Sequence, residues 1–305
     1  MPPGERARVT VVIVTWNACA VLGRCLDSLA AQRVDGGFET IVVDNASTDA
    51  TAELLRRYSD RVRVITNHHN AGFSEANNEA AREAAGEILF FLNPDTELRG
   101  TDVLERLAQT VSDPIVGLAG PMLVNPDGSL QPSCSAHPSV GLALLVGSGL
   151  HRLVPDRLLA RVAPQFWSHD RTLDTGWLTG AALAVRADVF RELGGFWPTM
   201  YGEDEELAYR TLQRGLRVRF DRGATVMHLG NHSARQRWSS GERGARVARA
   251  EIEFLRTHYS RPRRAAIRII GAVAYTARWA AHSALKRTGA AGVYRAMARV
   301  YATGR

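Results

Sequence analysis

Cysteine is scarce in this sequence of 305 residues, which contains only Cys19, Cys25 and Cys134. None of the three belongs to a CxxC pair, and their odd number leaves at least one thiol without an intramolecular partner. The pattern argues against a disulfide framework and against a structural zinc site. We therefore expect the protein to work in a reducing, cytosolic environment.

Long apolar runs are also lacking. The N-terminus, MPPGERARVTVVIVTWN, passes from a short polar lead into an apolar stretch of about six residues, which is too short for a signal-peptide core or a membrane span. We therefore expect no translocation signal and a cytoplasmic protein. No low-complexity tract is present and 45% of the residues are apolar, so the chain can form one large domain, alone or with a smaller appendage.

Acidic residues are outnumbered by basic ones. The chain has 31 Asp and Glu against 38 Lys and Arg, a formal charge of +7 and a pI near 9.8. An excess of positive charge favours an anionic partner, such as a nucleotide, a diphosphate lipid, a membrane surface or nucleic acid. Nucleic acid is the weaker alternative, because the chain has no recognisable binding motif for it.

The first half of the chain alternates short β-branched runs with alanine-rich helical segments. This alternation predicts a βαβ series and a mostly parallel sheet, with strands at 9–16, 39–44, 61–66 and 87–92 and helices at 18–32, 49–58, 73–85 and 100–111. Ligands of such sheets bind outside the carboxyl ends of the strands. The polar residues at 15–17, 44–45 and 93–95 should therefore share one crevice, although each alone could be an ordinary turn residue.

The first strand and helix are joined by TWNACAVLGRC, without the GxGxxG that a dinucleotide-binding dehydrogenase needs. Without a phosphate-cradling loop, a bound diphosphate needs another counter-charge. A divalent cation on Asp95 would supply it, because Mg²⁺ commonly bridges a carboxylate and substrate phosphates.

Seven short motifs follow one another along the chain: TWN, VVDNASTD, NAGFSEANN, LNPD, GWLTGAALAVR, GEDEEL and MHLGNHS. In this order the chain resembles the inverting family-two glycosyltransferases with the GT-A fold, especially their rhamnosyltransferase-like branch. The resemblance covers residues 8 to 235, approximately. It implies an α/β GT-A domain over 1–239, with a nucleotide-sugar half at 1–120, an acceptor half at 121–239 and a helical extension at 240–305.

The resemblance implies a set of nucleotide-binding residues at the strand ends and in the loops after them: Thr15, Asn17, Asp44, Asn45, Asn70, Asn77 and Asn93. Asp44 would accept a hydrogen bond from a pyrimidine imide, which favours a deoxythymidine-diphosphate (dTDP) sugar first and a uridine-diphosphate (UDP) sugar second. Asn70 and Asn77 could equally be loop and helix-cap residues.

The NPD sequence stands where the family has its DxD motif. Asp95 is therefore the implied metal ligand, while Asn93 replaces the first aspartate and would reach the ribose. The resemblance makes His228 a second ligand, whereas without it a lone histidine at the end of the apolar run ATVMHL would favour a hydrogen-bonded core residue. We expect Mg²⁺ or Mn²⁺, and the missing carboxylate at Asn93 leaves strict metal dependence open.

Four acids, residues 203–206, begin a predicted helix after a glycine-rich loop. The positive end of a helix stabilises each nearby acidic side chain by about 0.3–1 kcal/mol. This effect accounts for one or two acids at a helix start better than for four. Like charges packed together raise the pKa of at least one carboxylate, as a general base requires. The resemblance implies Asp204 as that base. Glu203 is the runner-up and a further acceptor-side residue.

Two tryptophans of the second half, Trp177 and Trp197, could offer a face to a sugar or lipid of the acceptor, although ordinary packing is the commoner role of this residue. The resemblance implies a single in-line displacement that inverts the anomeric centre. The sequence agrees, because it has no recognisable Ser or Cys nucleophile motif.

The C-terminal extension is predicted to be helical, with a charged helix at 240–258 and a new helix beginning near Pro262. Helical spacing gathers one basic stripe: Arg261, Arg264, Arg268, Tyr275, Arg278, His282 and Lys286. Opposite it lie the apolar residues Ile269, Ile270, Val273, Ala277 and Ala280. Because Arg268 and Arg278 interrupt any span, we expect the helix to lie on a surface, either an anionic membrane or its own domain.

These expectations describe a glycosyltransferase that moves rhamnose or a related deoxysugar from a nucleoside-diphosphate donor. The acceptor would be a lipid-linked saccharide, a polysaccharide end or a small glycoside. The alternative is a catalytically silent sugar-nucleotide or nucleic-acid binding protein. The sequence leaves the oligomeric state open.

Overall fold

The protein is represented by a computed structural model that describes residues 7–198, 201–230 and 238–305. Within these residues the chain forms two compact units. The first comprises 7–135, 168–198 and 203–230, and the second comprises 136–167, 201–202 and 238–305. The sequence suggested a boundary near residue 239, whereas the structure groups 136–167 with the C-terminal helices.

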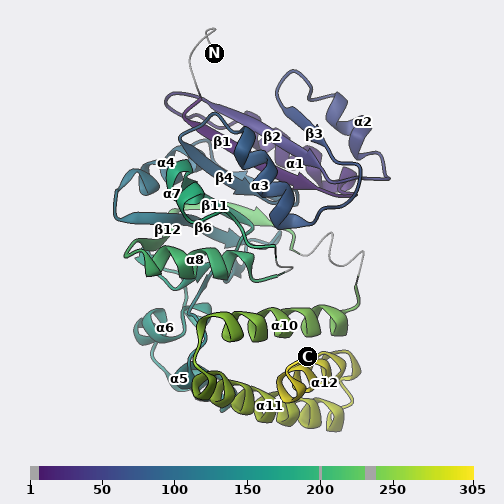
Figure 1. Ribbon diagram of the computed structural model, residues 1–305, viewed down its shortest axis with the longest axis vertical. Coiled ribbons are helices and arrows are strands. Elements are labelled where there is room, and N and C mark those ends of the chain that lie inside the picture. Colours follow the sequence, from purple (N-terminus) through teal and green to yellow (C-terminus); the bar gives the residue numbers. More distant parts are fainter. Residues whose placement is uncertain (1–6, 199–200, 231–237) are drawn as a thin grey trace. The chain divides into compact units, whose positions relative to one another are not determined.

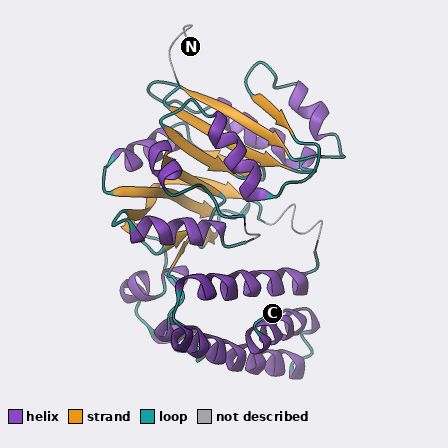
Figure 2. Ribbon diagram, in the orientation of Figure 1, coloured by secondary structure: helices purple, strands orange, loops and turns teal. Residues whose placement is uncertain are grey.

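The strands belong to the first unit, and the elements described in the second unit are helices (Figure 2). The strands are β1 (Val9–Thr15), β2 (Phe38–Asp44), β3 (Arg63–Thr66), β4 (Ile88–Leu92), β5 (Thr96–Arg99), β6 (Val116–Val124), β7 (Leu130–Gln131), β8 (Cys134–Ser135), β9 (Leu173–Asp174), β10 (Trp177–Leu178), β11 (Ala182–Arg186) and β12 (Arg217–His228).

The central sheet has the strand order β3-β2-β1-β4-β11-β6-β12-β5 (Figure 1). Strands β3, β2, β1 and β4 are parallel, which confirms the predicted βαβ series. Strand β11 then runs antiparallel between β4 and β6, and β12 pairs parallel with β6. The β-branched residues of β1 and β2 other than Val14 are buried, because helices including α1 and α3 pack on this part of the sheet.

The helices of the first unit are α1 (Cys19–Ala30), α2 (Thr51–Arg56), α3 (Phe73–Glu83), α4 (Val103–Ser112), α7 (Ala187–Glu192) and α8 (Glu203–Gln213). Helices α1 to α4 agree with the predicted helices to within a few residues at each end, and α8 begins at the four acids as predicted. Helix α4 shows how they form the core: five of its ten residues are buried, at the three- and four-residue spacing of one helix face.

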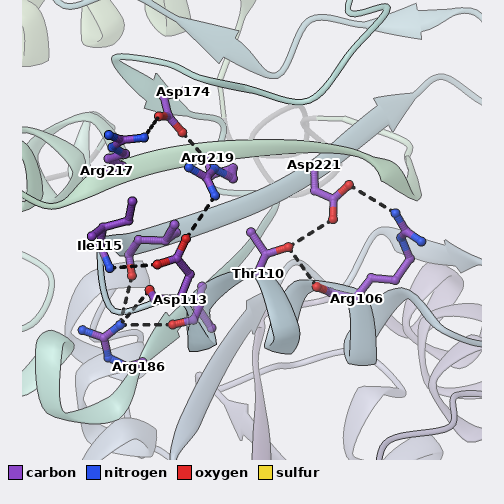
Figure 3. Close-up of polar contacts among 11 residues, drawn as sticks. Arg106, Thr110, Asp113, Ile115, Asp174, Arg186, Arg217, Arg219 and Asp221 are labelled. Carbon is purple, nitrogen blue, oxygen red and sulfur yellow. Dashed lines mark hydrogen bonds and ion pairs between the residues drawn. The ribbon is translucent and has the colours of Figure 1, made fainter.

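Arginine side chains bind the end of α4 to the neighbouring strands (Figure 3). Arg186 of β11 donates to the carbonyls of Val111, Asp113 and Val116 at 3.1, 3.4 and 3.1 Å. Arg219 of β12 makes ion pairs with Asp113 at 3.5 Å and with Asp174 at 2.9 Å. The carbonyls of Val111 and Asp113 are at the end of α4, so Arg186 satisfies two groups that a helix end leaves unpaired.

The second unit contains α5 (Val140–Gly147), η1 (Leu150–Leu153), α6 (Asp156–Val162), η2 (Pro164–Phe166), α10 (Ser240–His258), α11 (Arg261–Ala284) and α12 (Thr288–Thr303). Helix α10 begins with a capping box in which Ser239 and Glu242 bond to each other's backbone N–H groups. Pro262 stands in the first turn of α11, as the sequence predicted.

Two residues of the predicted basic stripe of α11, Arg268 and Arg278, bond to neighbouring helices, whereas Arg261 and Lys286 at its ends are exposed. Arg268 donates to the carbonyl oxygens of Tyr301 and Ala302 at the end of α12, each at 3.2 Å. Arg278 donates to the carbonyl of Val146 in α5 at 2.6 Å. The physical reason is that carbonyls at a helix C-terminus lack partners and carry partial negative charge, which attracts guanidinium groups.

The three cysteines are free thiols, as predicted. Burial raises the pKa of Cys25 and of Cys134 to about 12, so both are unreactive packing residues at neutral pH. Among the described residues, no helix is long and apolar enough to cross a membrane.

Candidate active site

The carboxyl ends of three parallel strands meet at one edge of the sheet, where the sequence placed the site. Thr15 at the end of β1 is opposite Asp44 at the end of β2, and the N–H of Asn45 donates to the carbonyl of Thr15 at 2.9 Å. Strand β4 pairs with β1 on the other side and ends at Leu92, just before the NPD sequence. The predicted crevice residues therefore share this edge.

The loops after β1 and β2 are bonded to each other through side chains. Asn17, in the left-handed region at φ 49°, accepts from the N–H of Thr48 at 2.7 Å, and its own N–H donates to Ser47 at 2.9 Å. Asp44 is buried and accepts from the N–H of Ser47 at 3.0 Å. The two loops are thus held in one arrangement at the edge where a nucleotide base was predicted.

Asn45 and Asn70 belong to a second polar cluster beside this loop pair. Asn45 donates to the side-chain oxygen of Asn70 at 3.1 Å and accepts from the N–H of Ala71 at 3.0 Å. Asn77 is almost fully buried in α3 and donates to the carbonyl of Phe73 at 2.8 Å. The structure therefore brings Asn45 and Asn70 together at the edge, whereas the Asn77 side chain bonds to its own helix.

The neighbouring residue, Asn78, has a structural role that the sequence reasoning missed. Its side chain accepts from the N–H of Phe196 at 2.8 Å and donates to the carbonyl of Phe196 at 2.7 Å. This pair of bonds ties α3 to the loop that precedes α8. The pair of asparagines in NAGFSEANN was the available signal. The partner, Phe196, is 118 residues away, so the residues around Asn78 do not indicate it.

Asp95 and His228 come together because β5 pairs antiparallel with β12, with Thr96 opposite His228. The N–H of Leu229 donates to the carbonyl of Asp95 at 3.0 Å. Both residues are buried, and Asp95 Oδ1 lies 3.3 Å from His228 Nε2. Two residues 133 positions apart in sequence thus face each other beside the NPD loop.

Gln131 fixes the ring of His228, and the sequence reasoning did not find it. Its side-chain oxygen lies 2.7 Å from His228 Nδ1, while its amide nitrogen donates to Asn125 at 3.0 Å. This orientation makes Nδ1 the protonated donor nitrogen, so in the neutral ring the lone pair is on Nε2. Nε2 is buried without a hydrogen bond and lies beside the Asp95 carboxylate.

The oxygen and nitrogen of this pair suit a divalent cation. Adjacent ligands of an octahedral Mg²⁺ or Mn²⁺ at about 2.1 Å are about 3 Å apart, close to the 3.3 Å between Asp95 Oδ1 and His228 Nε2. A hydrogen bond to the other ring nitrogen is the usual support of a metal-bound histidine. The described residues contain no group of three or more acidic, His or Cys ligands, so further ligands would be water or phosphate oxygens.

Asp204 lies at the start of α8 and is fixed by backbone donors. Its Oδ2 accepts from the N–H of Gly180 at 2.7 Å and its Oδ1 from the N–H of Glu205 at 2.9 Å. The residue after Gly180, Ala181, accepts from the N–H of Asn93 at 2.9 Å. The backbone of Gly180 and Ala181 therefore contacts both Asp204 and the NPD sequence that contains Asp95. A Cβ on Gly180 would lie 3.2 Å from Oδ2 of Asp204, which favours glycine there.

The four acids at the start of α8 have different environments. Burial raises the pKa of Asp204, and the N–H donors of Gly180 and Glu205 lower it in part. Burial, and then the charge of Asp204, raises the pKa of Glu205 to about 8. The prediction of a raised pKa agrees with these values, but burial rather than like charge is the larger cause. Glu206 is buried and paired with Arg210, with Nε–Oε distances of 2.7 and 2.8 Å.

Arg210 also organises the loop that carries Trp197. Its guanidinium donates to the carbonyls of Leu193 and Gly195, and it lies 5.5 Å from the centroid of the Trp197 ring. Trp177 is in the short strand β10, which pairs with β8, and both tryptophans keep partial exposure. The ion pair of Glu206 with Arg210 therefore connects the acidic helix start to one of the predicted acceptor-side residues.

Comparison with known proteins assigns part of the chain to a known family. The family model for glycosyl transferase family 2 matches residues 10–132. The chain carries a family-two glycosyltransferase domain. The match spans β1 to β7, including the NPD loop and the loops after β1 and β2, and it agrees with the resemblance noted in the sequence.

Two relatives of the family-two domain come from bacteria. The O-antigen biosynthesis protein RfbC of Myxococcus xanthus is 32% identical over 217 residues, covering 69% of this chain and 16% of that protein. The N-acetylglucosaminyl-diphospho-decaprenol L-rhamnosyltransferase of Mycobacterium tuberculosis is 29% identical over 241 residues, covering 73% of this chain and 76% of that protein. This chain therefore spans about a sixth of the first relative and about three quarters of the second.

Solved structures show that the family-two domain has the GT-A fold. The mannosyltransferase PcManGT of Pyrobaculum calidifontis, in complex with GDP-Man and Mn²⁺, has a TM-score of 0.58 at 21% identity, covering 98% of this chain and 85% of that one. GalNAc-T7 with UDP, GalNAc and Mn²⁺ has a TM-score of 0.55 at 20% identity, covering 72% of this chain and 42% of that one. At these identities the likeness concerns the fold.

Proposed function

We propose that the protein is an inverting glycosyltransferase that moves a sugar from a nucleoside-diphosphate donor to an acceptor hydroxyl. The observation that carries the proposal is the facing pair of Asp95 and His228 on the sheet edge that also holds Asp204. The family-two match over residues 10–132 supports the same class of reaction. One site then provides a place for the diphosphate and a separate carboxylate for the acceptor.

Asp204 is the proposed general base. Its raised pKa favours accepting a proton, and the two backbone donors leave lone pairs of both oxygens available. The proton of the acceptor hydroxyl passes to Asp204 as the hydroxyl oxygen bonds to the anomeric carbon. The bond from that carbon to the diphosphate oxygen breaks, and the diphosphate leaves with the electron pair. A single attack of this kind inverts the anomeric centre.

Asp95 Oδ1 and His228 Nε2 are the atoms proposed to hold Mg²⁺ or Mn²⁺, which when bound would balance the negative charge of the diphosphate. Gln131 holds the histidine in the tautomer that this needs. Asn93, in place of a second carboxylate, makes the site less negative, so we expect the cation to bind more tightly with the nucleotide than alone.

The proposed donor is a dTDP-sugar, with a UDP-sugar as the second choice, and the sugar is rhamnose or a related deoxysugar. The rhamnosyltransferase of M. tuberculosis at 29% identity supports this choice of sugar. A hydrogen bond from the base to Asp44 would select a pyrimidine. Asn17, Asn45 and Asn70 would hold the surrounding loops in place for this contact. The proposed acceptor is a saccharide or a lipid-linked saccharide.

A thermal-shift panel with a coupled product assay tests the proposal. The ligands are the diphosphates dTDP, UDP and GDP, the corresponding nucleotide sugars, and NAD. Each is tested with and without Mn²⁺. A ligand at 100 times its dissociation constant should stabilise the fold by about 2.7 kcal/mol. Stabilisation by pyrimidine diphosphates, followed by sugar transfer with an inverted product, supports the enzyme. Binding without donor turnover on any saccharide acceptor would favour the catalytically silent binding protein.

A further inference from the structure

Exposed large apolar side chains are concentrated in the second unit. Thirteen are exposed among the described residues, and only Val64 and Ile115 belong to the first unit. Ten lie on two stretches of the second unit, from α5 to η2 and from α11 to Leu285: Leu144, Leu150, Leu153, Leu158, Val162, Phe166, Ile269, Val273, Trp279 and Leu285. Such concentration is typical of an interaction surface.

One side of α11 is exposed along the helix and carries no charge. We define the outer face of α11 by its exposed residues at helical spacing: Ala265, Ile269, Val273, Thr276, Ala277 and Ala280. Ile269 and Val273 are 65% and 66% exposed. The charged residues of the helix centre, Arg268 and Arg278, are bonded to α12 and α5 instead. This is the reverse of a helix that faces water, whose exposed side is polar.

Helix α5 extends the apolar character beside α11. Its sequence VGLALLVG has no charged residue, and none of its residues is buried. It packs on α11 through Gly147, where a Cβ would lie 3.2 Å from the Cβ of Ala274, and through the bond from Arg278 to Val146. Leu153, in the short helix after α5, is 80% exposed. Two adjacent helices therefore leave apolar side chains without a protein partner in the second unit.

The charge around these helices is of one sign. From residue 254 to residue 305 the sequence has eleven Arg and Lys and no Asp or Glu. Exposed basic residues stand at both ends of α11, with Arg261 and Arg263 at its start and Lys286 and Arg287 just after it. An apolar face between basic ends complements an anionic bilayer, whose headgroups attract the charges and whose acyl boundary takes up the apolar side chains.

We propose that the outer face of α11 binds the interface of an anionic lipid bilayer, with the helix lying in the membrane plane. Burial of Ile269 and Val273 among the acyl chains provides attachment, and the basic residues at the helix ends favour anionic headgroups. Arg268 and Arg278 stay on the protein side in this orientation, so neither has to leave its carbonyl partners. The proposal goes beyond the transfer reaction and does not rest on it.

Vesicle co-sedimentation of the full chain tests the proposal. The probes are vesicles of phosphatidylcholine with phosphatidylglycerol, and of phosphatidylcholine alone. We expect binding to the anionic vesicles at low salt. The double variant Ile269→Glu, Val273→Glu should bind about 100-fold more weakly, because each apolar side chain lost from the interface weakens binding about tenfold. The control is Ile115→Glu in the first unit, 45% exposed, which should bind like the parent chain.

Charge is tested separately. The double variant Arg261→Gln, Lys286→Gln should weaken binding to anionic vesicles about fivefold per charge and leave the weak binding to neutral vesicles unchanged. The milder pair Ile269→Ser, Val273→Ser repeats the apolar test if the glutamate variant unfolds.

The proposal is overturned if the intact chain ignores anionic vesicles at low salt, or if the Ile269 and Val273 variants bind them as the parent does. Concentration-dependent self-association by light scattering, without vesicle binding and lost in the same variants, would assign the outer face of α11 to a second copy of the chain.

Discussion

Replacing Glu205 by glutamine should change how the stability of the protein depends on pH. Glu205 is buried at the start of α8, and burial with the charge of Asp204 raises its pKa from 4.5 to about 8. In the unfolded chain the carboxyl group ionises at its ordinary pKa. Between these two values the folded protein holds a proton that the unfolded chain has released.

This difference in bound protons sets the sign and size of the change in unfolding free energy with pH. The folded state binds more protons, so the free energy of unfolding decreases as the pH rises through the window, by up to about 1.4 kcal/mol per pH unit. Below the unfolded pKa the stabilising contribution is fully present. Asp204 has a raised pKa as well and shares the titration, so the slope belongs to the pair rather than to either residue.

Urea unfolding at a series of pH values from about 5 to 8 measures the slope, since this range lies between the ordinary pKa of Glu205 and its folded pKa of about 8. Glu205→Gln keeps the shape and removes the charge, so it should be more stable than the parent chain near pH 8 and show a shallower slope. Glu192→Gln, an exposed change at the end of α7, is the control and should leave the slope unchanged. Equal slopes for Glu205→Gln and the parent, or a variant less stable near pH 8, would refute the reasoning.

Three further variants test the site and the frame around it. Asp204→Asn should cut turnover by about 10²–10⁴-fold with donor binding nearly intact, measured by steady-state kinetics and thermal shift, and a larger loss in Glu203→Gln would exchange the two roles. Asp95→Asn should lose the Mn²⁺-dependent part of nucleoside-diphosphate stabilisation, and an unchanged metal-dependent shift would contradict the ligand assignment. Arg186→Ala leaves three carbonyls without their donor and should cost about 1–3 kcal/mol in urea unfolding, whereas the exposed change Arg56→Ala should cost almost nothing.

The parallel part of the sheet could be predicted because its evidence is local. Strands β1, β2 and β4 are short, mostly apolar runs, and helices α1 and α4 have apolar residues at helical spacing, so these elements show their type in their own residues. The edge that holds Thr15, Asp44 and Asp95 followed from the rule that parallel strands end on the same side. The order of β11, β6, β12 and β5 did not follow, because antiparallel insertion leaves no comparable local signal.

The partners within the site depended on tertiary structure. Asp95 and His228 were named through the family resemblance, but Gln131, which fixes the histidine ring, lies 97 residues from it in sequence. Asn78 holds the loop of Phe196 across 118 residues. A single amide in a loop or helix has no pattern that indicates such a partner, so these contacts became visible only in the folded chain.

The sequence by itself determined that α11 is a helix with a basic and an apolar side, because spacing along one helix is a local property. Which side turns inward was decided by the tertiary structure. The end of α12 and the backbone of α5 present carbonyl groups that need donors, and Arg268 and Arg278 supply them. Those bonds turn the charged side toward the protein and leave Ile269 and Val273 outside, since a rigid helix cannot bury both of its sides against the same neighbours.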